Sequence, residues 1–218
     1  EVLISNLPKE KQILIKKYVS PFFNLAYKSA SKIISLGEFM NERLINKGVK
    51  KQNIEIIKNW ALGDINLVRF PNKLSKAWNI NSKLTILYSG NLGIAHEWET
   101  LFEAVRLGQF STNEIQLIFV ASGRRLEEAK QFARKYLKKN QVIFKPLVDI
   151  DLLPYTMGLA DLGYISLRSN FQGNVVPSKF SGYLARGIPM IYVGPDSEIK
   201  KILKDSNSGK TFELKDVK

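Results

Sequence analysis

The segment SGNLGIAHEW, residues 89–98, combines two glycines with the only histidine of the chain. Gly90 and Gly93 follow an apolar run that predicts a strand, and His96 stands where a helix is expected to begin. Glycines at such a turn let backbone N–H groups approach a phosphate at a helix N-terminus. Asn91 adds an amide, and a histidine here can hydrogen-bond a phosphate or a sugar hydroxyl. A tight turn with a surface histidine explains the same residues without any ligand.

Two further loops carry cations that suit a phosphate. The segment ASGRR ends with Arg124 and Arg125, and either guanidinium could clamp a diphosphate or lie on a solvated helix face. Ser178 and Lys179 follow a proline at the predicted start of a helix, where a hydroxyl, backbone N–H groups and an ammonium come together. These loops therefore favour a ligand that carries a diphosphate.

The stretch VDID places Asp149 and Asp151 two residues apart, a spacing in which carboxylates can hold a divalent cation. The pair also stands at the predicted start of a helix, where aspartates cap free N–H groups and favour the helix dipole. Capping is the favoured interpretation. With no cysteine and one histidine, the sequence predicts no metal site.

The elements that must position these loops alternate between short apolar runs and helical patterns. The runs do not alternate polar with apolar residues, which is typical of parallel strands covered on both faces. They lie at 83–89, 115–122, 141–145, 162–166 and 189–193, with helices between them, one of which places Trp98, Leu101, Phe102 and Val105 in the core. The pattern predicts a doubly wound, Rossmann-like α/β domain over 83–218, with ligands at the carboxyl ends of the strands.

The first sixty residues form a smaller part with strands expected at 32–35 and 53–59 and a helix between them. Before them, residues 8–30 read as a basic and apolar helical segment that Pro21 breaks or kinks. Weak periodicity predicts a linker over 61–82. We therefore expect three parts: 1–60, 61–82 and 83–218.

Composition narrows the class of protein. The 218 residues are 44% hydrophobic, which is usual for a globular protein and excludes disorder as a description of the whole chain. The absence of cysteine excludes disulfides and thiol catalysis. No apolar run approaches the roughly 18 residues of a membrane span. The net charge of +13 points to a negatively charged partner such as a phosphate, a nucleic acid or an anionic membrane surface, unless biased codon usage explains the lysines.

Four stretches resemble the family 4 glycosyltransferases of GT-B architecture, and more narrowly the bacterial branch that builds cell-surface polysaccharides: KIISLGEFMNERLINKGVKKQNIEIIKNW, YSGNLGIAHEWETL, IQLIFVASGRR and VVPSKFSGYLARGIPMIYVGPDSEI. The resemblance implies two Rossmann-like domains, the N-terminal one for the acceptor and the C-terminal one for the nucleotide sugar. Residues 83–213 resemble the donor domain, and 1–60 only the last part of the acceptor domain. It implies that the chain lacks most of the N-terminal domain, and its start at Glu1 rather than Met agrees with this expectation.

The resemblance also implies a set of donor-binding residues, although the sequence departs from the family pattern. Asn91 and His96 stand where many members have Arg and Lys, and Asn174 and Gly182 stand where many have two glutamates. Gln172 is a polar substitute nearby, and the backbone of 145–147 is where the family reads the base. The donor-binding residues expected are Gly90, Asn91, Gly93, His96, Arg124, Pro146, Leu147, Gln172, Asn174, Ser178 and Lys179.

The implied reaction moves a sugar from a nucleotide diphosphate-sugar, UDP-sugar in particular, to a lipid-linked or saccharide acceptor in surface polysaccharide synthesis. Basic side chains and N–H groups can stabilise the leaving diphosphate, so no cofactor or metal is expected. The catalytic groups of the acceptor side are unknown, and this chain alone is expected to be inactive. The implied location is cytoplasmic, with the basic N-terminal segment either at the anionic inner leaflet or simply solvated.

Other function classes require features that the sequence lacks. A nucleic-acid-binding α/β module would gather basic residues and exposed aromatics on one face, whereas here the basic residues are spread over every predicted helix. A sugar-nucleotide epimerase on the same scaffold would need acid and base groups in the cleft, and a nicotinamide oxidoreductase a full G-x-G-x-x-G turn. We expect no nucleic acid partner. Self-association is expected if nothing covers Ile33, Ile34, Met40, Leu44, Ile54 and Ile56.

Overall fold

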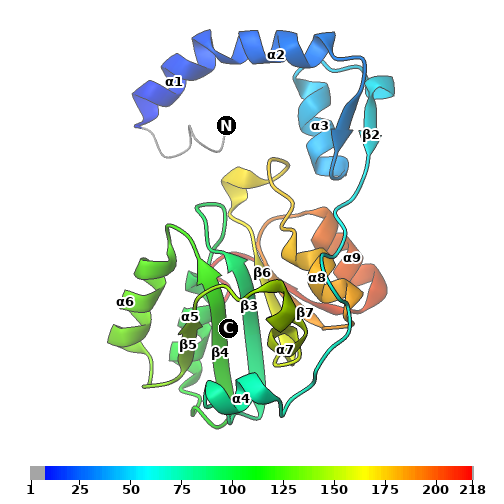
Figure 1. The fold of residues 1–218 in the computed structure, drawn as a ribbon. Helices are drawn as coiled ribbons and strands as arrows, with labels where there is room; N and C mark the ends of the chain where they lie inside the picture. The colour runs from blue at the N-terminus through cyan, green and yellow to red at the C-terminus, as the bar shows by residue number, and fades with distance from the viewer. Residues whose placement is uncertain (1–7, 218) are drawn as a thin grey trace. The chain divides into compact units, whose positions relative to one another are not determined.

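The structure is a computed structural model that describes residues 8–217. The chain forms two compact units (Figure 1). The first contains the residues up to Asn59 together with Ser169–Val176 and Asp196–Glu198, and the second contains the rest. Within the described residues, no helix is both long and apolar enough to cross a lipid bilayer.

The first unit has a small parallel sheet. Strand β1 (Ile33–Ser35) pairs with β2 (Ile54–Ile56), and helix α3 (Glu38–Asn46) and the 3-10 turn η2 (Lys51–Asn53) connect them. Within this unit, the Glu198 carboxylate accepts the backbone N–H of Phe39 at 2.8 Å and so satisfies a free donor in the first turn of α3. Among its described residues, the buried apolar side chains are Leu44, Val49 and Phe171.

Two helices, α1 (Lys9–Tyr18) and α2 (Ser20–Ser29), precede this sheet in the chain. Pro21 lies in the first turn of α2, where its missing N–H leaves no helical hydrogen bond unmade. The prediction that Pro21 interrupts the helical segment is confirmed. Apolar side chains of both helices are exposed, as Ile13 and Phe22 illustrate at 66% and 72%.

The second unit is built on a six-stranded parallel sheet in the order β5-β4-β3-β6-β7-β8. Numbered from its own first strand, this is the 3-2-1-4-5-6 order of a doubly wound Rossmann domain, so the predicted fold class is confirmed. The strands are β3 (Leu84–Asn91), β4 (Ile115–Ser122), β5 (Val142–Lys145), β6 (Leu162–Ser166), β7 (Met190–Val193) and β8 (Gly209–Phe212).

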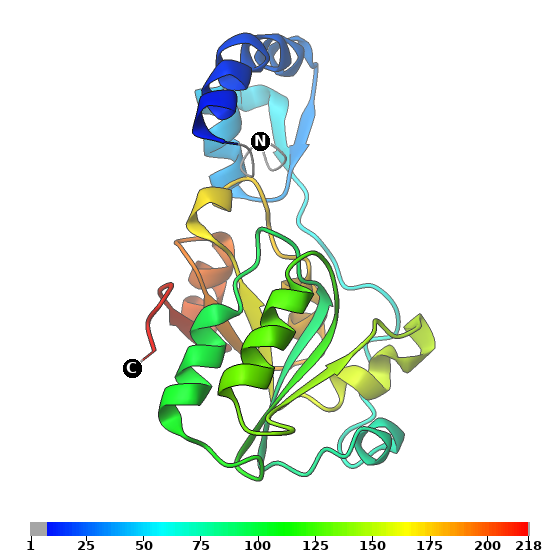
Figure 2. The same cartoon turned by 90° about the vertical axis from the view of Figure 1, so that its left-hand side faces the viewer.

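Helices cover both faces of this sheet. Helices α5 (Glu99–Gly108) and α6 (Leu126–Tyr136) lie on one face, and α8 (Lys179–Ala185) and α9 (Glu198–Ser206) lie on the other (Figures 1 and 2). A short helix, α7 (Leu153–Met157), follows the 3-10 turn η3 (Ile150–Leu152). The 3-10 turn η4 (Ser169–Phe171) belongs, like η2, to the first unit. Because both faces are covered, the middles of β3 and β4 are continuous runs of buried residues.

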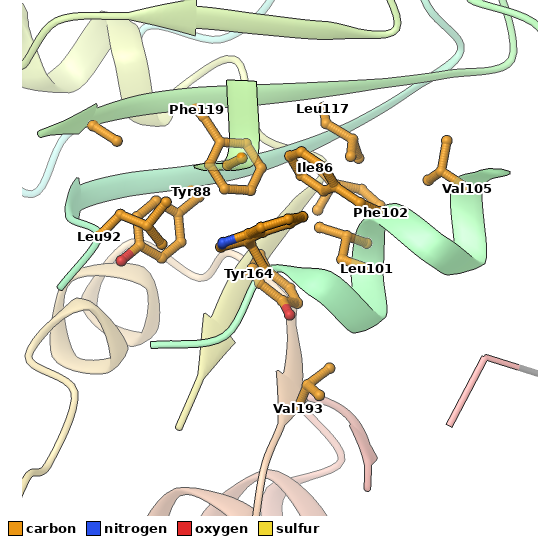
Figure 3. Packing of buried hydrophobic residues seen from close by; sticks show 13 residues of the cluster. Ile86, Tyr88, Leu92, Leu101, Phe102, Val105, Leu117, Phe119, Tyr164 and Val193 are labelled. Carbon is orange, nitrogen blue, oxygen red and sulfur yellow. The ribbon is translucent and has the colours of Figure 1, made fainter. Parts of the chain in front are cut away.

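The core between the sheet and α5 is largely aromatic. Tyr88 and Phe119 stack with ring centroids 5.1 Å apart, and Phe102 meets Phe119 edge to face at 5.1 Å (Figure 3). The four apolar residues that the spacing assigned to the core are all buried, which confirms that prediction: Trp98, Leu101, Phe102 and Val105.

Two elements of the second unit have no counterpart among the sequence predictions. Helix α4 (Lys73–Ala77) lies inside the predicted linker, so that part of the linker prediction is wrong. A capping box begins this helix, in which Asn72 Oδ1 accepts the N–H of Ser75 while Ser75 Oγ accepts the N–H of Asn72. Strand β8 is the other addition, and it extends the sheet beyond β7.

Candidate functional site

The carboxyl ends of β3 and β6 lie side by side where the strand order reverses. From β3 the sheet extends through β4 on one side and through β6 on the other. In open α/β sheets, ligands bind in the crevice outside the strand ends at this switch point. Gly90 and Asn91 end β3, and Ser166 ends β6. The glycine turn singled out in the sequence therefore begins at the switch point.

Lys179, the first residue of α8, extends to the end of β3. Its Nζ donates to the backbone oxygen of Asn91 at 3.3 Å and lies 4.6 Å from the centre of the Tyr88 ring. The Tyr88 hydroxyl donates to the same oxygen at 2.7 Å. Gly90 has a φ of +129°, and a Cβ there would come within 3.0 Å of Lys179 Cε. Glycine at this position therefore both permits the turn and leaves room for the lysine.

Burial alters the charge behaviour of this lysine. It lowers the pKa of Lys179 to about 8, because an ammonium loses hydration in a partly enclosed site. The side chain remains mostly protonated at neutral pH, and a nearby anion would compensate for the lost hydration. Ser178 occupies the N-cap position of α8, is exposed, and makes no capping hydrogen bond with its side chain. Gly90, Asn91 and Lys179 are thus brought together, with Ser178 next to Lys179 in the chain.

His96 lies between β3 and α5, and the end of β6 holds its ring. Nδ1 is 2.9 Å from the backbone oxygen of Ser166, and the backbone N–H of His96 donates to Gly93 at 3.1 Å. Burial lowers the pKa of His96 to about 4, and the positive charge of Lys179 acts in the same direction. The imidazole is therefore neutral at neutral pH and adds no positive charge toward a diphosphate.

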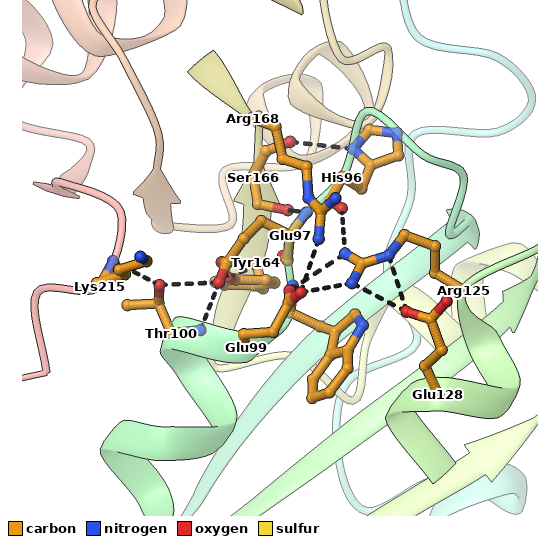
Figure 4. A network of polar contacts seen from close by, with 11 residues as sticks. His96, Glu97, Glu99, Thr100, Arg125, Glu128, Tyr164, Ser166, Arg168 and Lys215 are labelled. Atoms are coloured by element: carbon orange, nitrogen blue, oxygen red, sulfur yellow. Dashed lines mark hydrogen bonds and ion pairs between the residues drawn. The ribbon is translucent and has the colours of Figure 1, made fainter. Parts of the chain in front are cut away.

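The start of α5 is occupied by two carboxylates of the protein. Glu97 accepts the backbone N–H of Thr100 at 2.6 Å, and Glu99 accepts that of Trp98 at 2.9 Å. The Glu97 carboxylate also accepts the hydroxyl of Tyr164 at 3.2 Å (Figure 4). Burial raises the pKa of Glu97, and the hydrogen bonds from Thr100 act against that rise. The expectation that this helix terminus is open to a phosphate does not hold for α5.

Arg125 also takes part in the hydrogen bonds around the start of α5. It is 7% exposed, and it donates to Glu99 and to Glu128, and to the backbone oxygen of His96 at 2.9 Å (Figure 4). Arg168 donates to Glu99 as well, at 2.7 Å. Burial raises the pKa of Glu99, but the hydrogen bonds from Arg125 and the backbone outweigh it and bring the pKa to about 2. Arg125 therefore fixes loops, and its use as a diphosphate clamp is a wrong expectation.

The other predicted site residues are more scattered. Arg124 is exposed, as are Pro146 and Leu147 beyond the end of β5 at the edge of the sheet. Gln172 and Asn174 belong to the first unit. There the Gln172 amide donates to the backbone oxygen of Asp196 at 2.9 Å, and the backbone N–H of Asn174 donates to Phe171.

The paired aspartates of the VDID stretch stand at the start of a helical segment, as predicted, with Asp151 in the first turn of η3. Asp149 holds the N-cap position of η3, but its side chain makes no capping hydrogen bond. Its contribution is the backbone oxygen, which accepts the N–H of Leu152 at 3.0 Å. The capping prediction is therefore wrong for the Asp149 side chain. Residues 8–217 contain no group of three or more His, Asp or Glu side chains arranged to hold a metal ion.

Sequence reasoning missed three residues that shape the site: Tyr88, Ser166 and Arg168. Tyr88 and Ser166 lie within predicted strands, and Arg168 follows the run at 162–166. The available signal for Ser166 was its place as the last, polar residue of an apolar strand, since carboxyl ends of parallel strands are where ligand loops gather. No spacing in the sequence indicates that Arg168 and Arg125 share Glu99.

No protein-family model and no curated protein sequence matches this chain. Solved structures do resemble it. One of them is the apo form of the lipopolysaccharide outer core galactosyltransferase WaaB. Its TM-score is 0.63, with 16% identity over 86% of this chain and 50% of that one. Anabaena HepE in complex with UDP and glucose has a TM-score of 0.63 and 18% identity over 88% of this chain and 51% of that one.

Sucrose-phosphate synthase from Thermosynechococcus elongatus reaches a TM-score of 0.71 with 14% identity, over 99% of this chain and 53% of that one. The chain thus spans about half the length of each of these proteins. At such low identity the likeness shows the fold, which is the Rossmann-like α/β architecture of GT-B proteins.

Proposed function

We propose that this chain binds a nucleotide diphosphate-sugar, with UDP as its nucleotide, and is the donor-binding part of a glycosyltransferase. The observation that carries the proposal is the Lys179 ammonium, held against the glycine turn of β3 at the switch point of the sheet. A fixed cation in a partly desolvated site suits the charge that develops on a departing diphosphate. The HepE structures, which contain UDP with glucose or UDP-glucose, support the choice of ligand.

In such a reaction the bond between the sugar carbon and the diphosphate oxygen breaks, and the electron pair leaves with the diphosphate. A new bond forms between that carbon and an acceptor hydroxyl, which loses its proton. In this proposal Lys179 balances the charge of the leaving group, and the absence of a side chain at Gly90 leaves room for the lysine beside the end of β3.

The test is calorimetric titration of the full chain with UDP, UDP-glucose and uridine, and with GDP and ADP for the base. Lys179→Ala should weaken UDP binding about 5- to 150-fold, the effect of a charge-assisted contact worth about 1–3 kcal/mol. Uridine binding should be unchanged. Lys204→Ala, which removes an exposed lysine from α9, is the matched control. Equal losses for uridine and UDP, or no binding of any nucleotide, would contradict the proposal.

We further propose that the acceptor is a lipid-linked or other saccharide in the synthesis of a surface polysaccharide. Two of the similar structures support this class of acceptor. WaaB is a lipopolysaccharide outer core galactosyltransferase, and WaaG is a glycosyltransferase involved in lipopolysaccharide biosynthesis. Transfer assays with UDP-sugars and lipid-linked saccharides, in the presence of an acceptor-side partner domain, would test it.

A lipid-linked acceptor would place the protein at the cytoplasmic face of a membrane, and α1 and α2 suit such a surface. Phe22 and Phe23 are 72% and 54% exposed, and basic side chains such as Lys17 and Lys28 lie among the apolar ones. Apolar side chains can enter the headgroup region while lysines meet anionic lipids.

Sedimentation with vesicles tests this surface. We expect binding to vesicles rich in phosphatidylglycerol, weaker binding to phosphatidylcholine vesicles, and loss of binding when Phe22 and Phe23 are replaced by Ser. Leu107→Ser, at a 52% exposed leucine of the second unit, is the control. Equal sedimentation of the double variant and the wild type would contradict the assignment.

A further inference from the structure

The imidazole of His96 is fixed in orientation by a buried residue. The backbone oxygen of Ser166 lies 2.9 Å from Nδ1, and the Ser166 hydroxyl oxygen accepts the neighbouring N–H of Glu97 at 3.0 Å. Ser166 itself is 0% exposed at the end of β6. A carbonyl oxygen can only accept, so Nδ1 must carry the proton of this hydrogen bond.

The charges around the ring oppose a second proton. The ammonium of Lys179 acts on it from α8, and the guanidinium of Arg125 binds the backbone oxygen of His96 from the start of α6. The ring of Tyr88 in β3 lies nearly perpendicular to the imidazole, with the ring centroids 6.1 Å apart. The two nearby carboxylates are engaged elsewhere, Glu97 with Thr100 and Tyr164, and Glu99 with arginines. Burial of the ring and the charge of Lys179 lower the pKa of His96, and the hydrogen bond to Ser166 only partly opposes them.

The second nitrogen, Nε2, consequently carries no proton and can only accept a hydrogen bond. Among residues 8–217 it has no hydrogen-bond partner. Figure 4 shows it on the side of the ring that points away from the Glu99 network. A phosphate oxygen at neutral pH is also an acceptor, so it would meet the lone pair of Nε2 unfavourably. A hydroxyl would meet it favourably.

We propose that His96 Nε2 accepts a hydrogen bond from a sugar hydroxyl of the ligand, while Lys179 alone of this pair takes the diphosphate. The inference rests on the proposed nucleotide-sugar function and specifies which part of the ligand each of the two residues contacts. The hydroxyl comes either from the ribose or from the transferred sugar.

Because the chain has one histidine, its two ring nitrogens can be observed directly. Long-range proton–nitrogen NMR spectra of the nitrogen-labelled full chain distinguish the two neutral tautomers from the charged ring. We expect a neutral ring protonated on Nδ1 at neutral pH, and a change in the Nε2 resonance when UDP-glucose is added. A charged ring, or a neutral ring protonated on Nε2, would overturn the proposal.

His96→Phe provides a second measurement, since it keeps an aromatic ring and removes the acceptor. The Kd for UDP-glucose should rise about two- to tenfold, as expected for one neutral hydrogen bond. If the Kd for UDP rises equally, the hydroxyl belongs to the ribose. If only the Kd for UDP-glucose rises, it belongs to the transferred sugar. Unchanged Kd values for both ligands, with Nε2 also unmoved, would overturn the proposal.

Failure of this inference is distinguishable from failure of the proposed function. If UDP-glucose binds the wild type and Lys179→Ala weakens it, the nucleotide-sugar function stands whatever His96 does. If UDP and UDP-glucose do not bind the wild type, the proposed function fails, and the proposal for His96 fails with it.

Discussion

Helices α2 and α5 have the same length, ten residues, and both carry phenylalanine and leucine. Their surroundings differ. Helix α2 has no buried residue, whereas α5 buries Leu101, Phe102 and Val105 against the sheet. Apolar content alone therefore does not decide burial, because a helix face also needs a complementary surface. In the second unit the sheet provides that surface, and in the first unit α2 lacks it.

The two units also differ in how their charged side chains are placed. In the second unit, Glu99 pairs with Arg125 and Arg168, and these contacts hold the loops around the switch point. In the first unit, Lys11 and Lys17 of α1 and Lys28 of α2 have exposed side chains. Packed aromatics and paired charges give the second unit a defined site, while the first unit presents apolar and basic side chains outward.

The largest contrast should appear when one phenylalanine is removed from each unit. Phe102→Ala should cost about 3–5 kcal/mol of unfolding free energy, because Phe102 is fully buried among Trp98, Phe119 and Phe132. Phe22→Ala should change it by about 0.5 kcal/mol or less. Denaturant unfolding followed by far-ultraviolet circular dichroism, to which the helices of both units contribute, measures both. Similar costs for the two variants would contradict the comparison.

Removal of the charge of Glu99 should have the next largest effect on the free energy of unfolding. Glu99→Gln should destabilise the second unit by about 1–2 kcal/mol near neutral pH, a value kept low because the carboxylate is partly exposed. The folded pKa of Glu99, about 2, lies below its usual 4.5. The unfolded chain therefore takes up the proton first, and the advantage of the wild type shrinks as the pH falls through that window. Denaturant unfolding at several pH values tests this, and a constant difference would contradict it.

Much of the second unit could be predicted from the sequence, because its strands are long apolar runs. The run predicted at 115–122 is observed as β4 with the same bounds. Strand β8 was missed because GKTF is short and half polar, and its pairing with β7 depends on contacts from elsewhere in the sheet. Helix α4 was missed although Asn72 and Ser75 carry the spacing of a capping box, since the helix has only five residues.

The site was less predictable than the fold. Lys179 lies beside Gly90 because of the order of the strands in the sheet. The sequence predicts a loop at each strand end, but it does not predict which side chains of these loops are in contact. The neutral state of His96 depends on burial and on the charge of Lys179, and the orientation of its ring depends on Ser166; both residues are distant in sequence. The role of Arg125 was not predictable for a similar reason, since its partner Glu99 is the first residue of α5, 26 positions earlier in the chain.

Lys179→Met should change the free energy of unfolding by a smaller amount. Methionine has a side chain of similar length to lysine but carries no charge. The folded pKa of Lys179, about 8, lies below its usual 10.5. Between these values the unfolded chain binds the proton and the folded chain does not, so wild-type stability rises with pH there relative to the variant. Parallel denaturant curves across the window measure the difference. A wild-type advantage that falls with rising pH would be the contrary result.

The smallest effect on stability should come from the exposed apolar side chains of the first unit. Of the residues expected to need a cover, Leu44 is buried and Ile34 is 63% exposed, so exposure is confined to part of that set. Replacing Ile34 and Phe22 by Ser should change the unfolding free energy by about 0.5 kcal/mol or less at each position. It should nevertheless reduce self-association, because exposed apolar surface drives contact between copies. Sedimentation velocity over a range of concentrations should show association for the wild type and for Leu107→Ser, a control with one exposed leucine of the second unit removed. Association that persists unchanged in the double variant would mean that copies meet through another surface, and that exposed apolar residues of the first unit do not distinguish the two units in solution.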